Sequence, residues 1–169
     1  MLKLLIDKIP RITKNRKKLE ETLKVKITNR GKEVFINGKS EEEYFAEKVI
    51  ESLNFGFPYS QALLLKDGEY IFEIISIKDY TKRKDLKIIR SRIIGKQGKT
   101  LKTISTLTKC YFELKDNGIG IIGEPEYIQH AQQAIISLIK GSKQSNVYAY
   151  LEKHQPKPIL DLGLKIKIS

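Results

Sequence analysis

Two glycines separated by two polar residues, Gly95-Lys96-Gln97-Gly98, form the segment of this chain whose residue types could do the most specific chemistry. Glycine has no side chain and adopts positive φ angles, so such a segment can turn sharply and bring its backbone close to a ligand. Lys96 and Gln97 would then protrude toward that ligand. An amphipathic helix pattern begins directly afterwards, at Lys99, and its free N–H groups would favour a phosphate. The segment is therefore expected to grip a phosphate-bearing chain.

The positive charge of the protein is concentrated around this segment. Lys and Arg number 32 against 20 Asp and Glu, which gives a net charge of +12. Between Thr81 and Thr103 there are nine basic residues and a single acidic one, Asp85. A local excess of this kind attracts polyanions and speeds their encounter. A solvated lysine-rich loop is the alternative, and the adjacent glycines favour the functional interpretation.

The expected binding residues combine the loop, the cations beside it and the apolar pair before it. They are Arg90, Arg92, Ile93, Ile94, Gly95, Lys96, Gln97, Gly98, Lys99, Thr100 and Lys102. Ile93 and Ile94 would floor an apolar groove on which bases lie, with Tyr111 or Phe112 as its other wall. A duplex is too stiff and wide for such a groove, so the ligand should be single-stranded. The chemistry of the groove alone leaves RNA and DNA both open.

Catalysis and metal binding are not expected. Gly98-Lys99-Thr100 resembles the end of a nucleotide-binding P-loop, but the glycine that this motif needs five residues earlier is Ile93 here. No paired carboxylates or nucleophile–base pairs stand at a recognisable spacing. One cysteine and two histidines argue against a zinc site, and no cofactor motif is present. We expect a non-enzymatic protein without metal or cofactor.

Cysteine usage and hydropathy point to the cytoplasm. The single cysteine, Cys110, excludes an internal disulfide framework and suits a reducing compartment. Charge interrupts the start of the chain too early for a signal peptide, and no apolar run reaches membrane-spanning length. We expect a soluble cytoplasmic protein with no membrane partner.

The chain contains an internal repeat with an offset of 85 residues. The offset places Gly38 on Gly123, Ala46 on Ala131 and Gly56 on Gly141. Each copy predicts a strand, a helix, two strands and a long helix, and the second copy has room for a further short helix between Lys82 and Ile94. The expected elements of the two copies, in chain order, are 2–8, 14–23, 25–28, 33–37 and 41–54, then 70–77, 99–108, 111–115, 119–122 and 126–140. The predicted class is α+β, with a three-stranded antiparallel sheet backed by helices and built twice.

The two copies differ at the loop. The offset places Pro10-Arg11-Ile12-Thr13 on the glycine segment, so the first copy has no glycine there. Proline lacks a backbone donor, and Thr13 is expected to cap its helix instead. The second copy is therefore predicted to grip nucleic acid. The first copy is predicted to pack against the second, to orient it or to bind a protein.

With these residues in place, the chain resembles archaeal KH-domain RNA-binding proteins of the Partner-of-Nob (Dim-two) ribosome-assembly family. The resemblance covers roughly residues 1–153 and is most specific from Arg92 to Thr100. Further matching segments are Leu107-Thr108, Ile121 to Gly123, Ala134 to Gly141, Val147-Tyr148, Leu151-Glu152 and Asn54 to Leu65. It implies two tandem type I KH domains (βααββα): residues 1–66 as a degenerate domain without the GXXG loop, and residues 67–153 with that loop. Residues 154–169 form a C-terminal tail outside the resemblance, predicted to add a strand.

The resemblance also implies a function. Members bind single-stranded RNA near the 3′ end of small-subunit ribosomal RNA and assist its maturation beside the Nob-type endonuclease, without catalysis of their own. Contact with the alpha subunit of translation initiation factor two is implied as well. Two alternatives stay open: a messenger-RNA or exosome-type single-strand binder, and a scaffold whose KH modules bind only proteins. For the tail, pairing with a sheet edge of the same chain is favoured over docking to a partner.

Overall fold

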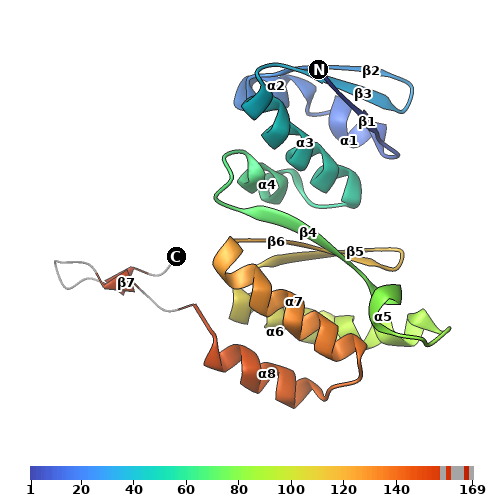
Figure 1. The fold of residues 1–169 in the computed structure, drawn as a ribbon, viewed down its shortest axis with the longest axis vertical. Coiled ribbons are helices and arrows are strands. Elements are labelled where there is room, and N and C mark those ends of the chain that lie inside the picture. Colours follow the sequence, from blue (N-terminus) through green and yellow to red (C-terminus); the bar gives the residue numbers. More distant parts are fainter. Residues whose placement is uncertain (157–158, 161–165, 168–169) are drawn as a thin grey trace. The chain divides into compact units, whose positions relative to one another are not determined.

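The structure, a computed structural model, describes residues 1–156, 159–160 and 166–167. Contacts within the chain divide it into two units. One unit comprises Met1–Ser76 with Tyr111–Pro125, and the other comprises Ile77–Cys110 with Glu126–Ser169. Both three-stranded sheets belong to the first unit, and the helices around the glycine loop belong to the second (Figure 1).

The first sheet contains β1 (Leu2–Leu5), β2 (Lys26–Arg30) and β3 (Glu33–Asn37), antiparallel in the order β1-β3-β2. The central strand has the alternation of a half-buried strand, because Val34 and Ile36 have no exposed surface while their neighbours along the strand are partly exposed. The predicted bounds of β3 are confirmed.

Helices α2 (Arg16–Leu23) and α3 (Ser40–Phe55) supply much of the core beside this sheet (Figure 1). The buried apolar side chains of the two helices recur every three or four residues. They are Leu19, Leu23, Ala46, Val49, Ile50 and Leu53. Full burial of a leucine or isoleucine contributes about 1.5–3 kcal/mol, so this stripe fixes α3 on the sheet. The prediction of a helix over 41–54 is confirmed to within one residue at each end.

The segment Pro10 to Thr13, predicted as a loop, is helical in the structure. It lies within α1 (Ile9–Thr13), whose first turn holds the proline. Proline is favoured there because the first N–H groups of a helix have no partner within the helix. The Thr13 hydroxyl donates back to the carbonyl of Ile9, at 3.4 Å, and Asn15 precedes α2. The expectation that Thr13 caps the following helix is therefore wrong.

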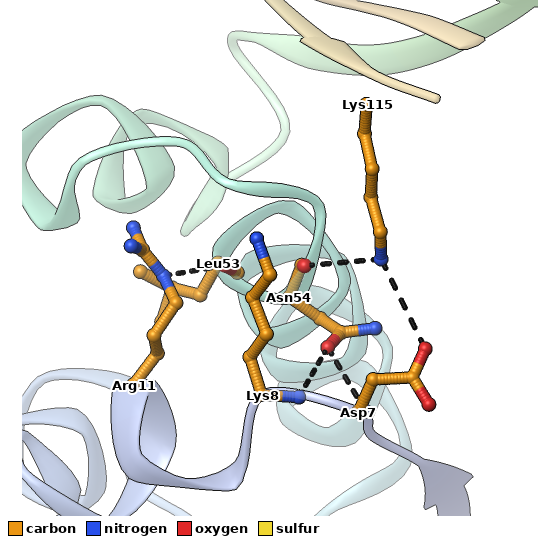
Figure 2. Close-up of polar contacts among 6 residues, drawn as sticks. All are labelled: Asp7, Lys8, Arg11, Leu53, Asn54 and Lys115. Atoms are coloured by element: carbon orange, nitrogen blue, oxygen red, sulfur yellow. Dashed lines mark hydrogen bonds and ion pairs between the residues drawn. The ribbon is translucent and has the colours of Figure 1, made fainter. Parts of the chain in front are cut away.

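Helix α1 is tied to the C-terminal end of α3 (Figure 2). The Arg11 guanidinium donates from Nε to the carbonyl of Leu53, at 2.9 Å, and from Nη2 to the carbonyl of Phe57, at 2.7 Å. The amide oxygen of Asn54 accepts the backbone N–H groups of Asp7 and Lys8, both at 3.1 Å. The last carbonyls of a helix lack intrahelical partners, and Arg11 supplies donors to that region.

The second sheet contains β4 (Ile71–Ser76), β5 (Tyr111–Lys115) and β6 (Gly118–Gly123), antiparallel in the order β4-β6-β5. The predicted hairpin at Asn117-Gly118 is confirmed. Its two-residue turn is Asp116 and Asn117, because Lys115 pairs directly with Gly118. Asp116 has a φ of 54°, which a short polar side chain tolerates.

Aromatic packing and one lysine join the second sheet to the segment after α3. Rings of Phe55 and Phe57 lie against Gly120, where an added Cβ would come within 2.8 Å of both rings. Phe72 of β4 meets the same two rings edge-on. Lys115 of β5 donates to the backbone carbonyl of Asn54, at 3.4 Å (Figure 2). The linking residues form α4 (Tyr59–Ala62) and the 3-10 turn η1 (Leu63–Leu65).

Among the described residues of the second unit up to 156, the regular elements are all helical. It contains η2 (Ile77–Tyr80), α5 (Leu86–Ile94), the short 3-10 turn η3 (Lys96–Gly98), α6 (Lys99–Thr108), α7 (Pro125–Ile139) and α8 (Gln144–Lys153). Helix α6 packs against both α5 and α8. The bounds predicted for α6 are confirmed, and those of α7 are shifted by one residue.

The 85-residue offset is present in the structure as well as in the sequence. It relates α2 to α6, β2 to β5, β3 to β6 and α3 to α7. The offset fails for the first strands, because Leu2 and Ile71 are 69 positions apart. The additional residues of the second copy lie between β4 and the glycine loop, where η2 and α5 stand. The copies therefore differ where the ligand is expected.

The C-terminal tail contains two described two-residue strands, β7 (Ile159–Leu160) and β8 (Ile166–Lys167), which pair antiparallel with each other. Of the strand predicted over Leu162 to Ile168, only Ile166 and Lys167 are described, and its pairing with a sheet edge stays a prediction. Among the residues that are described, no helix is long and apolar enough to span a membrane.

Candidate nucleic-acid interface

The glycine loop connects the end of α5 to the start of α6. Gly95 has φ 78° and ψ 173°, Gln97 has a φ of 57° and Gly98 has φ 76° and ψ 9°. Three of the four loop residues thus have positive φ. The N–H of Gly95 closes α5 on the carbonyl of Ser91, at 2.8 Å, and the N–H of Gly98 reaches the carbonyl of Gly95, at 3.2 Å. The loop is a defined turn with internal hydrogen bonds.

The two glycines are required for different reasons. The backbone of Gly95 lies in a region that only glycine adopts readily, and a Cβ at this position would stand 2.7 Å from the backbone nitrogen of Thr100. At Gly98 an added Cβ would meet nothing within 4 Å. Gly95 is therefore packed against the protein, while Gly98 presents an open backbone that a ligand can approach.

The side chains at the tip of the loop are exposed. Lys96 and Gln97 are both exposed, and the two glycines are half-buried. Helix α6 begins at Lys99 without a side-chain cap and has no acidic residue in its first turn. The N–H of Lys99 donates to the carbonyl of Lys96, while the positive end of the helix dipole stays available to an anion.

The predicted cations lie in two different environments. Lys96, Lys99 and Lys102 are exposed, as expected for side chains that meet a polyanion. Arg92 is half-buried, and its Nη2 donates to the backbone carbonyl of Ser142, at 2.8 Å. Arg92 therefore ties α5 to the connection between α7 and α8. Arg90 is half-buried.

Burial changes the roles of two other expected residues. Ile93 has no exposed surface and Thr100 is 3% exposed, so neither offers an area to a base or a phosphate. Ile94 is 39% exposed and is the apolar residue of this pair that can meet a ligand. We assign Ile93 and Thr100 to supporting the loop.

The support of Thr100 comes from a residue that sequence reasoning missed. Gln144, the first residue of α8, donates from Nε2 to the Thr100 hydroxyl, at 2.9 Å. Thr100 in turn fills the space beside Gly95. The apolar spacing of Val147 and Leu151 indicates a helix over this segment, and both are buried. No local pattern, however, connects Gln144 with a hydroxyl 44 positions earlier.

The structure also locates the side chains that could have done other chemistry. His130 Nδ1 lies 3.0 Å from the Tyr150 hydroxyl, and the rings of His130 and His154 stack at 4.6 Å. Cys110 is buried before β5. Over the described part of the chain, no group of three His, Cys, Asp or Glu side chains could hold a metal ion.

Three kinds of comparison place this geometry among known proteins. Residues 71–156 match the family model of the second KH domain of PNO1, described as the eukaryotic type KH-domain (KH-domain type I). A KH domain-containing protein of Methanocaldococcus jannaschii is 32% identical over 113 residues, which cover 66% of this chain and 50% of that protein. The pre-rRNA-processing protein PNO1 of Saccharomyces cerevisiae is 37% identical over 102 residues, or 59% of this chain and 37% of its own. The chain thus spans half or less of the length of these curated relatives.

Solved structures are similar over more of the chain. The crystal structure of Dim2p from Pyrococcus horikoshii OT3 has a TM-score of 0.82 at 28% identity, and the match covers 90% of this chain and 98% of that one. A complex of a/eIF2alpha, aDim2p and rRNA from the same organism contains a chain with a TM-score of 0.81 at 28% identity, covering 90% and 92%.

Proposed function

The chain belongs to the Pno1/Dim2 family of KH-domain ribosome-assembly proteins, and from this membership we propose that it binds single-stranded RNA through the loop of residues 95–98. The observation that carries the proposal is the open backbone at Gly98, set between the exposed side chains of Lys96 and Gln97 and the uncapped start of α6. A GXXG loop of this kind clamps about four nucleotides of a single strand by their backbone.

The proposed RNA is the 3′ region of small-subunit ribosomal RNA. The related PNO1 proteins are pre-rRNA-processing proteins, and a structurally similar Dim2p chain forms a complex with rRNA and a/eIF2alpha. We extend both partners to this chain. The Nob-type endonuclease, expected from the resemblance, stays a prediction. The protein itself would be non-catalytic, and its role would be to bind the RNA. Its proposed location is the cytoplasm.

The proposed organisation is two tandem type I KH domains, residues 1–66 and 67–153. The shared order of elements and the 85-residue offset support it. The first domain would lack RNA binding at its loop position, because Pro10 to Thr13 is helical and the guanidinium of Arg11 is held by backbone carbonyls. Its proposed role is to position the second domain or to meet a protein.

The test is a charge reversal at the tip of the loop. Replacement of Lys96 and Gln97 by Asp should reduce the affinity for a single-stranded RNA of about twelve nucleotides by a large factor, because a phosphate would face two carboxylates. Both side chains are exposed, so the thermal stability should change little. Fluorescence anisotropy measures the affinity, and circular dichroism checks the fold.

A matched control carries the same change in net charge on the first sheet. Lys26→Asp with Asn29→Asp alters two exposed positions of β2. This control should retain most of the affinity. If the loop variant binds RNA as tightly as the original protein, the loop is not the binding site, and if both variants lose affinity equally, binding is a general charge effect.

A further inference from the structure

A small cationic pocket lies beside α5 in the second unit, separate from the tip of the glycine loop. It has a volume of about 230 Å³. Its apolar floor includes Ile89 and Ile139, and its cationic lining residues are Lys82, Arg83, Arg92 and Lys140. Among the described residues that line it, none is acidic. We refer to these four cations and the floor as the α5 pocket.

The α5 pocket gathers four cations and has no acidic lining residue among those described, which favours an anion as its ligand. Like charges in one concave site repel each other, and low-dielectric walls strengthen the field inside the site. Lys82, Arg83 and Lys140 are exposed, so water can screen them. Arg92 is less free, because it is half-buried and held in place by the carbonyl of Ser142. A fixed guanidinium presents its remaining donors in a set direction, which suits a phosphate.

The backbone at the end of α7 is already satisfied. The N–H groups of Lys140, Gly141 and Ser142 reach the carbonyls of Ile136, Leu138 and Ser137. At this end of α7 the pocket therefore offers side-chain donors and no free backbone donor. Its chemistry is that of a site where lysine and arginine side chains bind a compact anion.

The sequence places this pocket next to the proposed RNA track. Arg92 is three residues before Gly95, which is less than one turn of α5 and roughly 5 Å along the helix axis. An RNA strand bound at Gly95 to Gly98 continues beyond the loop. One path for it follows the last turn of α5 to Arg92. The same helix thus connects the loop with a second group of cations.

We propose that the α5 pocket binds a backbone phosphate of the RNA, beyond the nucleotides gripped by the loop. This inference rests on the proposed function, since the RNA must first be held at Gly95 to Gly98. It makes the footprint longer than the roughly four nucleotides of a GXXG loop. An acidic peptide would satisfy the same charges, but RNA is favoured because α5 joins the pocket directly to the loop.

The experiment compares RNA length in two double variants. Lys82→Ala with Arg83→Ala removes two exposed cations of the pocket, and Lys84→Ala with Lys87→Ala removes two exposed cations that do not line it. Each variant is titrated with an RNA of about four nucleotides and with one of about twelve. Circular dichroism confirms that both variants fold.

The pocket variant should lose roughly tenfold in affinity for the longer RNA, the scale of one charge-assisted hydrogen bond, and should bind the shorter RNA unchanged. The control variant should lose clearly less on the longer RNA. The inference would be overturned by equal losses in the two variants or by no loss in the pocket variant. It would also be overturned if the pocket variant lost affinity for an acidic peptide while its affinity for the longer RNA stayed unchanged.

The outcomes also separate this inference from the proposed function. If the original protein binds both RNAs and only Lys96→Asp with Gln97→Asp abolishes binding, the function stands and the α5 pocket is excluded. If the original protein binds neither RNA, the proposed function fails, and the pocket inference fails with it.

Discussion

Thr100 occupies the space that a side chain at Gly95 would need. The backbone nitrogen of Thr100 would lie 2.7 Å from a Cβ at that position, and the threonine itself is held by Gln144. The first glycine of the loop is therefore fixed by packing inside the protein, and the second glycine is free to meet a ligand. This difference separates effects on stability from effects on binding.

Substitution of the two glycines by alanine should have different consequences. Gly95→Ala places a methyl group against Thr100 in a glycine-only backbone region, and should cost roughly 1–3 kcal/mol in the free energy of unfolding. Gly98→Ala meets open space and should cost about 1–2 kcal/mol from its left-handed backbone alone. Chemical denaturation measures both costs.

Affinity for RNA should respond differently from stability. The methyl group of Gly98→Ala lies where the RNA backbone must approach, so affinity should fall more per kcal/mol of lost stability than in Gly95→Ala. If the affinity of Gly98→Ala falls no more per kcal/mol of lost stability than that of Gly95→Ala, the RNA does not approach this backbone.

Loss of the Gln144 side chain should make the loop less rigid, and its effect on RNA binding should be indirect, through Thr100. Gln144→Ala removes a hydrogen bond worth about 0.5–1.5 kcal/mol, and RNA affinity should fall by up to roughly tenfold. Thr100→Val removes the other partner. The double variant should be no weaker in binding than the worse single variant, because both changes break one interaction.

Gln133, exposed on α7, offers a control for this cycle. Gln133→Ala should leave the affinity unchanged. Fully additive losses in Gln144→Ala and Thr100→Val would mean that the two residues act separately, contrary to the geometry.

The 85-residue offset supplies a matched pair of lysines. Lys99 and Lys14 occupy equivalent positions and both are exposed. Lys99→Asp should weaken RNA binding and reduce the slope of log affinity against log salt by about 0.7 for each phosphate that the lysine no longer neutralises. Lys14→Asp should change the affinity little and leave that slope intact. Equal effects would show that the two copies are not specialised.

Glu113 should make stability depend on pH. Burial raises the pKa of this carboxyl, although Arg11 and Lys8 act in the opposite direction. A raised pKa in the folded state means that the contribution of Glu113 to stability is fully present below its ordinary pKa and is lost as pH rises through the folded value. Glu113→Gln should therefore increase the free energy of unfolding near neutral pH and much less near pH ~4.

Urea unfolding at the two pH values measures this difference. Glu21→Gln removes the same charge from an exposed site on α2 and serves as the comparison. A larger gain for Glu113→Gln at low pH than at neutral pH would contradict the sign of the shift.

Periodic elements of the fold could be predicted, because their signal is local. The stripe of Val49, Ile50 and Leu53 located α3 to within a residue, and the bounds of α6 follow from Leu101, Ile104 and Leu107 in the same way. Asn117-Gly118 predicted the hairpin, although the turn itself lies one residue earlier, at Asp116 and Asn117. These elements form wherever the apolar period is clear.

Other features depend on partners far away in the sequence. Alignment with the glycine loop made Pro10 to Thr13 look like a loop, although proline is at home in the first turn of a helix. The position of Arg11 is decided by carbonyls 42 and 46 residues later. Thr100 and Arg92 look like ligand-binding residues until Gln144 and Ser142 are placed beside them. Composition alone could not reveal these tertiary hydrogen bonds.

The most direct test of RNA binding by the loop is a titration of the isotope-labelled protein with single-stranded RNA, followed by NMR of the backbone amides. We expect the largest changes in chemical shift from Gly95 to Thr100, with smaller changes from Arg11 to Asn15. Changes confined to residues 11–15, or equal changes on addition of a duplex of the same sequence, would contradict the claim that this loop grips an unpaired strand.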